Sequence, residues 1–219
     1  MDNHNETGPQ APADRAVVLV VDDNEGMRSA LRRLLAKAQL GVETFASGSE
    51  FLAAARFDRP GCIVLDVAMP QMTGLEVQAQ LKQREVALPV VFLTGSADIP
   101  IAVAAMREGA VDFIEKPFDN DDLVARVRRA IARDAAQRRS EVELAGLRQR
   151  HGKLTPRERE VMELVVTGLT SKEVARRLGA SHRTVEIHRA RLMEKMQAPT
   201  LAELVRLRLL LNPDLGGAA

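Results

Sequence analysis

The sequence predicts an α/β domain followed by a smaller, all-helical domain. Short apolar runs alternate with amphipathic stretches up to residue 134, and only helical patterns follow from residue 153 onward. The charge separates in the same way. Residues 17–134 carry a net charge of −3 and residues 153–219 a net charge of +4, although the whole 219-residue chain carries only +1. The two halves therefore indicate two modules with different partners.

Composition excludes several classes of protein. The chain has no Trp, no Tyr and only 6 Phe, which argues against an aromatic platform for single-stranded nucleic acid and against an aromatic-lined pocket. Its one cysteine, Cys62, excludes an internal disulfide framework and a cysteine-based zinc site. No apolar run approaches the roughly 20 residues of a membrane span, and the polar start lacks a signal-peptide pattern. The sequence thus predicts a cytoplasmic protein with no membrane partner.

Five apolar runs predict the strands of a parallel sheet, because continuous Val, Ile and Leu are typical of strands buried on both faces. These runs are residues 17–21, 42–45, 62–65, 89–93 and 111–114. The helical patterns that follow them are residues 26–38, 49–56, 75–84, 101–108 and a longer one from 121. Five such units make one doubly wound domain, residues 16–133, with the flavodoxin-like strand order 2-1-3-4-5. Residues 1–15 form a flexible tail in front of it.

Polar side chains stand at the carboxyl ends of these strands. Asp22 and Asp23 follow the first strand, Asp66 the third, Thr94 the fourth and Lys116 the fifth. Strands one and three are neighbours in the predicted order, so the three carboxylates converge. Converging carboxylates either take up a proton or bind a cation, and ligands that are all oxygen favour Mg²⁺, with Mn²⁺ as the alternative. A carboxylate flanked by such a cation and a lysine is equipped to attack phosphorus.

The segments LVVDDNE, LDVAMPQMTG, FLTGSAD and VDFIEKPF, in this order, resemble the receiver domain of two-component response regulators over residues 17–133. The resemblance implies that Asp66 accepts a phosphoryl group from a sensor histidine kinase. It also implies that Mg²⁺ is held by Asp22, Asp23, Asp66 and the backbone carbonyl of Ala68.

The same resemblance assigns the residues that would respond to the phosphoryl group. Thr94 is the switch hydroxyl, Phe113 the switch aromatic and Lys116 the amine that pairs with phosphate. Lys116 also precedes an expected cis peptide bond to Pro117. The added charge would draw Thr94 inward, and Phe113 would fill the space that Thr94 leaves.

Residues 134–152 are polar and rich in Arg and Ala, which predicts a helical linker. The C-terminal module, residues 153–212, then shows four helical patterns, and residues 213–219 form a tail. Thr155 and Glu158 form a capping box around Pro156 at the first helix start, and Gly168 is a natural stop. The other helices are expected at residues 171–178, from Ser181 to about Met196, and at 201–211. The core positions expected from their periodicity are Val161, Leu164, Val165, Val174, Ala175, Leu178, Val185, Leu192 and Met196.

The turn between the second and third of these helices has helix-turn-helix spacing. From charge alone, an ordinary bundle with a solvated basic face is an equal alternative. The segment LTPREREVMELVVTGLTSKEVARRLGASHRTVEIHRARLMEKM strongly favours the helix-turn-helix. It resembles the LuxR-type helix-turn-helix of NarL/FixJ regulators over residues 154–211, and most closely the FixJ-like branch. The resemblance implies that the third helix enters the major groove of double-stranded promoter DNA.

The candidate DNA contacts are Arg183, Thr184, Glu186, Ile187, His188 and Arg191. Glu186 and Ala190 depart from the NarL pattern, which has lysine at both positions. Because a glutamate accepts a hydrogen bond from the amino group of cytosine, we expect a different base preference.

The resulting hypothesis is a phosphorylation-activated transcriptional regulator, not an enzyme, that pairs on phosphorylation and acts with RNA polymerase. The candidate residues for pairing two copies are Ile101, Val103 and Met106 in the receiver and Leu204 and Val205 in the last helix. One alternative is a DNA-binding dimer that does not depend on phosphorylation. The other is an aspartyl-phosphate phosphatase of the haloacid-dehalogenase type. Such a phosphatase requires a second Asp two residues beyond the nucleophile, where this chain has Ala68.

Overall fold

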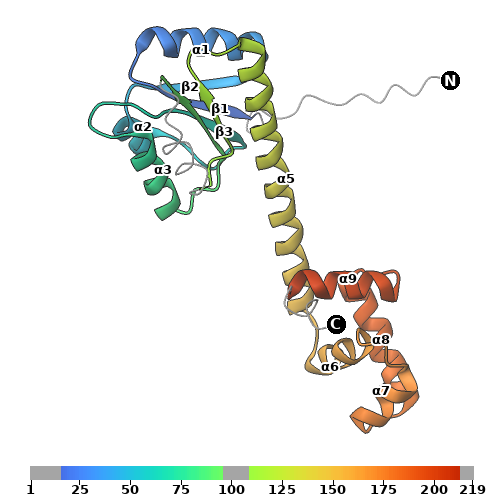
Figure 1. Cartoon of the computed structure of the whole chain (residues 1–219). Coiled ribbons are helices and arrows are strands. Elements are labelled where there is room, and N and C mark those ends of the chain that lie inside the picture. The colour runs from blue at the N-terminus through green and yellow to red at the C-terminus, as the bar shows by residue number, and fades with distance from the viewer. Residues whose placement is uncertain (1–15, 96–108, 213–219) are drawn as a thin grey trace, which may run out of the picture. The chain divides into compact units, whose positions relative to one another are not determined.

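A computed structural model describes residues 16–95 and 109–212 of the chain (Figure 1). The chain divides after Gln137 into two compact units, each of which is described by itself. The elements of the first unit are β1 (Val17–Val21), α1 (Glu25–Lys37), β2 (Gly41–Phe45), α2 (Gly48–Ala54), β3 (Gly61–Asp66), α3 (Gly74–Gln83), β4 (Val90–Thr94), β5 (Asp112–Glu115) and the first part of α5 (Asn120–Gly152). The five predicted strands are all present, with ends shifted by no more than one residue.

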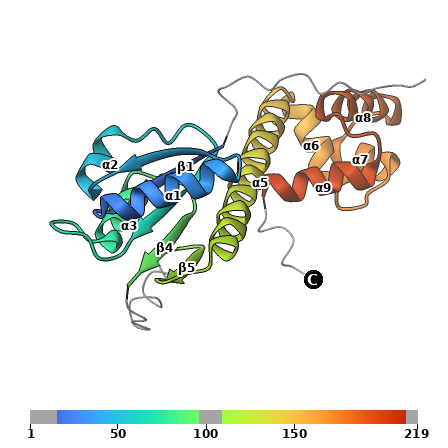
Figure 2. The same ribbon diagram turned by 90° about the horizontal axis from the view of Figure 1, so that it is seen from above.

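The five strands form one parallel sheet in the order β2-β1-β3-β4-β5, as predicted. Alternate residues of β1 face opposite sides of this sheet. Leu19 and Val21 pack in a core with α2 and α3, whereas Val18 and Val20 pack in a second core with α1 and α5. The result is a three-layer α/β sandwich (Figure 2). Since β1 and β3 are adjacent and parallel, their carboxyl ends lie side by side.

Side-chain caps explain where the first helices begin. Asn24, Ser47 and Thr73 each accept a hydrogen bond from a backbone amide in the first turn of α1, α2 and α3, which satisfies one of the free amides of a helix start. The helix predicted at residues 101–108 lies outside the described residues. The same is true of the pairing candidates Ile101, Val103 and Met106.

Residues 134–152, for which the sequence predicts a helical linker, are helical and form the second part of α5. Leu147 in this part is 1% exposed and belongs to the core of the second unit. The remaining elements of that unit are α6 (Pro156–Val165), α7 (Ser171–Leu178), α8 (His182–Met196) and α9 (Leu201–Leu211). The capping box of Thr155 and Glu158 is present as predicted. Gly179 adopts a left-handed conformation with φ of 60° at the end of α7, which glycine tolerates without strain.

The core of the second unit follows the predicted helical periods. Leu164 and Leu178 are half-buried, and the other expected core positions are buried. Leu204, predicted to contact a second copy, is 0% exposed in this core. Its side chain packs inside the unit and does not reach the surface, so that prediction is corrected. Val205 is half-buried.

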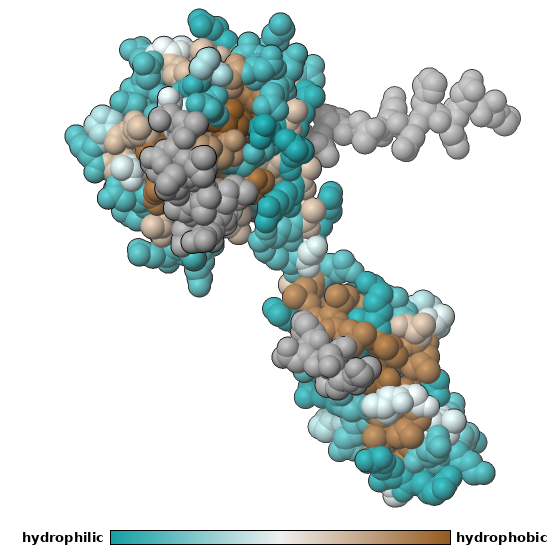
Figure 3. Space-filling view, in the orientation of Figure 1, coloured by the Kyte–Doolittle hydropathy of each residue, from teal (hydrophilic) through white to brown (hydrophobic). Residues whose placement is uncertain are grey.

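The C-terminal unit exposes apolar surface in the region of α9 (Figure 3). Leu209 and Leu210 are the large apolar side chains of α9 that are exposed, at 40% and 44%. Among the helices in the described part of the chain, none is long and apolar enough to cross a membrane.

Candidate functional site

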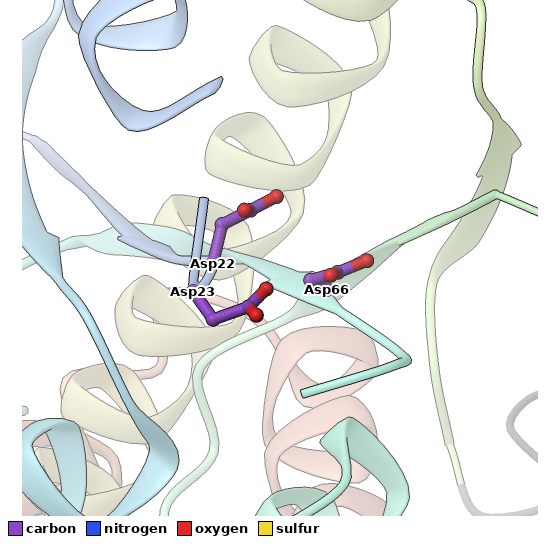
Figure 4. Close-up of side chains that lie close together, drawn as sticks. All are labelled: Asp22, Asp23 and Asp66. Atoms are coloured by element: carbon purple, nitrogen blue, oxygen red, sulfur yellow. The ribbon is translucent and has the colours of Figure 1, made fainter. Parts of the chain in front are cut away.

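Three carboxylates meet at the carboxyl ends of β1 and β3. Asp22 and Asp23 directly follow β1, and Asp66 is the last residue of β3. One oxygen from each of the three lies within 4.8 Å of the others, and Figure 4 shows the three side chains projecting to the same side. Asp22 is 0% and Asp66 6% exposed, whereas Asp23 is exposed. The strand order thus brings together the carboxylates that the sequence singles out.

Lys116 joins this cluster from the loop after β5. Its Nζ donates to Oδ2 of Asp22 at 2.8 Å and to Oδ1 of Asp66 at 3.1 Å. The backbone amide of Lys116 donates to the carbonyl oxygen of Thr94 at 2.6 Å, which fixes the loop to the end of β4. The bond between Lys116 and Pro117 is cis, as the resemblance to receiver domains implies.

The charges of the cluster shift the pKa values of its members. Burial raises the pKa of Asp66, and this effect outweighs the hydrogen bond from Lys116, which lowers it. Burial alone would lower the pKa of Lys116, but its hydrogen bonds to Asp22 and Asp66 raise it above the usual lysine value. Three carboxylates and one ammonium group leave an excess of negative charge. An all-oxygen donor set with this excess fits a hard divalent cation such as Mg²⁺.

The end of β3 is held by a close approach of α3. The backbone amide of Gly74, the first residue of α3, donates to the carbonyl oxygen of Val67 at 2.9 Å. A Cβ atom at Gly74 would lie 2.3 Å from the backbone oxygen of Asp66, so only glycine fits there. Ala68 lies in the loop between β3 and α3, two residues after Asp66, and is exposed.

The predicted switch residues occupy the neighbouring strands. Thr94 is the last residue of β4 and is 5% exposed. Phe113 lies on β5 and is half-buried, with its ring centroid 6.4 Å from that of Phe92 on β4. Because β4 pairs with both β3 and β5, the strand with Thr94 lies between the strand with Asp66 and the strand with Phe113.

The candidate DNA contacts lie on the outer face of α8. One face of this helix packs in the core through Val185, Leu192 and Met196. The exposed candidates are Arg183, Thr184, Glu186, Ile187 and Arg191, and Ile187 is 45% exposed. Thr184 also shares a hydrogen bond with the hydroxyl of Ser181, at 2.7 Å.

The remaining candidate, His188, is half-buried, and its Nδ1 atom is buried with no hydrogen-bond partner among the described residues. Only the other ring nitrogen of His188 can therefore face a ligand without movement of the ring.

Sequence reasoning missed Arg28, which touches the acidic loop. Its Nη1 donates to the backbone carbonyl oxygens of Asp22 and Asp23, at 2.8 and 2.9 Å. Arg28 lies on α1 and not at the end of a strand, where the other residues of the site stand. The available signal is its spacing: Arg28 stands one helical turn after Asn24, the residue that caps α1.

Two family models match the chain. The response regulator receiver domain matches residues 18–128, and the family described as bacterial regulatory proteins, luxR family, matches residues 152–208. The chain belongs to the two-component response regulators of the NarL/FixJ type. It is a phosphorylation-activated transcription regulator and not an enzyme, and its family implies a histidine kinase and DNA as partners.

The alignments with similar curated proteins extend over most of both chains. The chain is 43% identical over 190 residues to transcriptional regulatory protein FixJ of Bradyrhizobium diazoefficiens, which covers 87% of this chain and 93% of that protein. It is 40% identical over 200 residues to nodulation protein W of the same organism, with 91% and 88% covered.

Among solved structures, the response regulator StyR superposes with a TM-score of 0.79 at 39% identity, covering 89% of this chain and 98% of that chain. Full-length FixJ from B. japonicum superposes with a TM-score of 0.56 at 40% identity, covering 91% and 98%.

Proposed function

We propose that Asp66 is the phosphoacceptor of this response regulator. The observation that carries the proposal is the pair of hydrogen bonds from Lys116 to Asp22 and Asp66 inside the acidic cluster. One carboxylate oxygen of Asp66 forms a bond to phosphorus while the P–N bond of a kinase phosphohistidine breaks. The electron pair of the broken bond returns to the imidazole, which takes up a proton from water. Lys116 is placed to compensate charge on the phosphoryl oxygens.

Asp22, Asp23 and Asp66, together with the backbone carbonyl of Ala68, would hold Mg²⁺ or Mn²⁺. When bound, the cation offsets the negative charge that carboxylates and phosphoryl oxygens bring to the same place. The support for this assignment is the chemistry of the donor set and the spacing of its oxygens within 4.8 Å.

The phosphoryl group would act on Thr94 and Phe113. A dianionic group at Asp66 attracts the Thr94 hydroxyl as a hydrogen-bond donor. Movement of Thr94 frees space for the ring of Phe113, which already contacts the core on the β4 side. Repacking of this kind is a two-state change biased by local charge. It would promote pairing of two receivers, with Ile101, Val103 and Met106 as candidates from outside the described residues.

In the paired state, two output domains would bind two DNA half-sites with α8 in the major groove. Arg183, Thr184, His188 and Arg191 suit contacts to phosphates, which position the helix. Glu186 and Ile187 suit contacts to base edges, where carboxylates accept from cytosine and apolar groups meet thymine methyls.

Three further assignments belong to this proposal. Val205 of α9 is the remaining candidate for contact between output domains, because it is half-buried and not enclosed in the core. RNA polymerase is the proposed partner at the promoter. Since chromosomal DNA is the proposed target, the protein would act in the cytoplasm.

Phosphorylation of the purified full chain by phosphoramidate with Mg²⁺ tests the assignment of Asp66. We expect intact-mass spectrometry to detect one added phosphoryl group on the wild type and none on Asp66→Asn. Asp58→Asn is the matched control, because Asp58 is an exposed carboxylate of the same domain. Phosphorylation of Asp66→Asn to the wild-type extent would overturn the assignment. Repeated turnover of an organic phosphate would favour the phosphatase alternative instead.

A further inference from the structure

The loop between β1 and α1 carries two of the three clustered carboxylates and is held by one side chain. Nη1 of Arg28 donates to the carbonyl oxygen of Asp22 at 2.8 Å and to that of Asp23 at 2.9 Å. A terminal guanidinium nitrogen carries two hydrogens, so this single atom can serve both carbonyls. Arg28 is half-buried and lies near the start of α1.

The two carbonyls need such a donor because they stand in front of the helix. The first carbonyl of the helical pattern belongs to Asn24, which accepts from the backbone amide of Arg28 at 3.0 Å. The amide of Asn24 donates to Oδ1 of Asp22 at 2.8 Å, and its side chain accepts from the amide of Met27. Arg28 therefore joins the helix through its backbone and holds the acidic loop through its side chain.

This loop is under electrostatic strain, because carboxylates whose oxygens lie within 4.8 Å repel one another. Asp22 is 0% exposed, so its carboxylate cannot turn into water unless the backbone moves. Lys116 bonds directly to the carboxylate oxygens. Within residues 16–95 and 109–212, by contrast, Arg28 bonds to the carbonyls and makes no ion pair with the three aspartates. It can hold the loop without occupying oxygens that a cation would use.

We propose that Arg28 is a positioning residue that pre-organises Asp22 and Asp23 for a divalent cation. This inference rests on the proposed Mg²⁺ site and adds the residue that keeps it in shape. Residues that orient metal ligands from outside the ligand set typically contribute about tenfold or more to metal affinity. We therefore expect Arg28→Met to weaken Mg²⁺ binding by about tenfold.

Isothermal titration calorimetry of the full chain with MgCl₂ as the only ligand tests the proposal. Arg33→Met is the matched control, because Arg33 is exposed on the same helix and its removal changes the charge equally. The control should bind Mg²⁺ like the wild type. Arg28→Lys should bind with intermediate affinity, because an ammonium group can donate to carbonyls, but its hydrogens are not held in a fixed plane as those of the guanidinium group are.

Equal Mg²⁺ affinity of Arg28→Met and Arg33→Met would overturn the inference. Circular dichroism at the titration temperature gives the folded fraction of each variant. An affinity loss of Arg28→Met no larger than its loss of folded fraction would also overturn the inference. If the wild type itself bound no Mg²⁺, the proposed metal site would fail, and the inference with it. If the wild type and Arg28→Met bound Mg²⁺ equally well, the proposed metal site would stand and only the role of Arg28 would be refuted.

Discussion

The ammonium nitrogen of Lys116 lies 3.1 Å from a carboxylate oxygen of Asp66. The same nitrogen lies 2.8 Å from Asp22, so one lysine compensates two buried carboxylates. A cation that bound these carboxylates would meet the positive charge of Lys116 at short range. Lysine and metal ion are thus partial competitors for the same oxygens, whereas both favour a phosphoryl group at Asp66.

Replacing Lys116 by methionine should therefore strengthen Mg²⁺ binding. Loss of about 1 kcal/mol of like-charge repulsion corresponds to roughly fivefold higher affinity. Calorimetric titration with MgCl₂ measures this change, with Lys37→Met, an exposed lysine of α1, as the control. Weaker Mg²⁺ binding by Lys116→Met than by the control would contradict this account of the lysine.

Removing the hydroxyl of Thr94 should leave phosphorylation of Asp66 intact but reduce the gain in DNA affinity that follows it. Thr94→Ala keeps the carboxylate cluster and should still become phosphorylated on Asp66. A hydrogen bond to a charged acceptor is worth about 1.5 kcal/mol, so the gain in DNA affinity on phosphorylation should fall by about tenfold. Fluorescence anisotropy with a labelled duplex measures this gain, and Thr94→Ser, which keeps a hydroxyl, should retain most of it. An undiminished gain in Thr94→Ala would show that the switch does not pass through this residue.

Arg183 should contribute to DNA binding through phosphates. Arg183→Gln should reduce the magnitude of the slope of log affinity against log salt by about 1 per subunit. It should weaken specific and non-specific duplexes alike, because phosphate contacts carry no base information. Arg206→Gln is the control, since Arg206 is an exposed arginine of α9 in the same unit. Equal slopes of log affinity against log salt for the two variants would show that Arg183 does not contact phosphates.

The ion pair between Glu158 and Lys195, at 2.6 Å, should stabilise the C-terminal unit in a pH-dependent way. Glu158 is 2% exposed, so Glu158→Gln should lower the free energy of unfolding by about 2 kcal/mol at pH 7. Burial would raise the pKa of Glu158, but Lys195 and Thr155 hold it below its ordinary value of 4.5.

A carboxyl group whose pKa is lowered in the folded state stabilises the fold at pH values above its ordinary pKa. This stabilisation is lost as the pH falls through the lowered pKa. The difference in the free energy of unfolding between the wild type and Glu158→Gln should therefore shrink below pH 4.5. Urea unfolding at neutral and acidic pH measures it, with the exposed Glu194→Gln as the control. A difference that persisted or grew in acid would rule out this explanation of the pair.

The fold and the main site were predictable because they follow from local patterns. Buried apolar runs give the strands, and Asp22 and Asp66 follow or end neighbouring strands, so parallel order alone makes them converge. The helix starts were equally predictable, because Thr155 caps α6 together with Glu158, which lies only three residues later in the sequence.

Contacts made by long side chains across the fold were not predictable in this way. The reach of Arg28 back to the loop carbonyls depends on side-chain conformation, which spacing does not reveal. The packing of Leu204 was not predictable from the sequence either. Its apolar character on a terminal helix suits either a partner or the core, and only the packing of α9 decides for the core.

We propose that a phosphoryl group on Asp66 controls DNA binding through the acidic cluster. The most direct measurement is the affinity of the full chain for a duplex that it selects from a random pool. It is measured with and without phosphoramidate and Mg²⁺, together with the molar mass in solution. We predict that phosphorylation raises the affinity of the wild type by about tenfold or more and shifts it to a dimer, while Asp66→Asn responds in neither respect. Equal DNA affinity and equal molar mass in every condition, for both proteins, would contradict control of DNA binding by phosphorylation of Asp66.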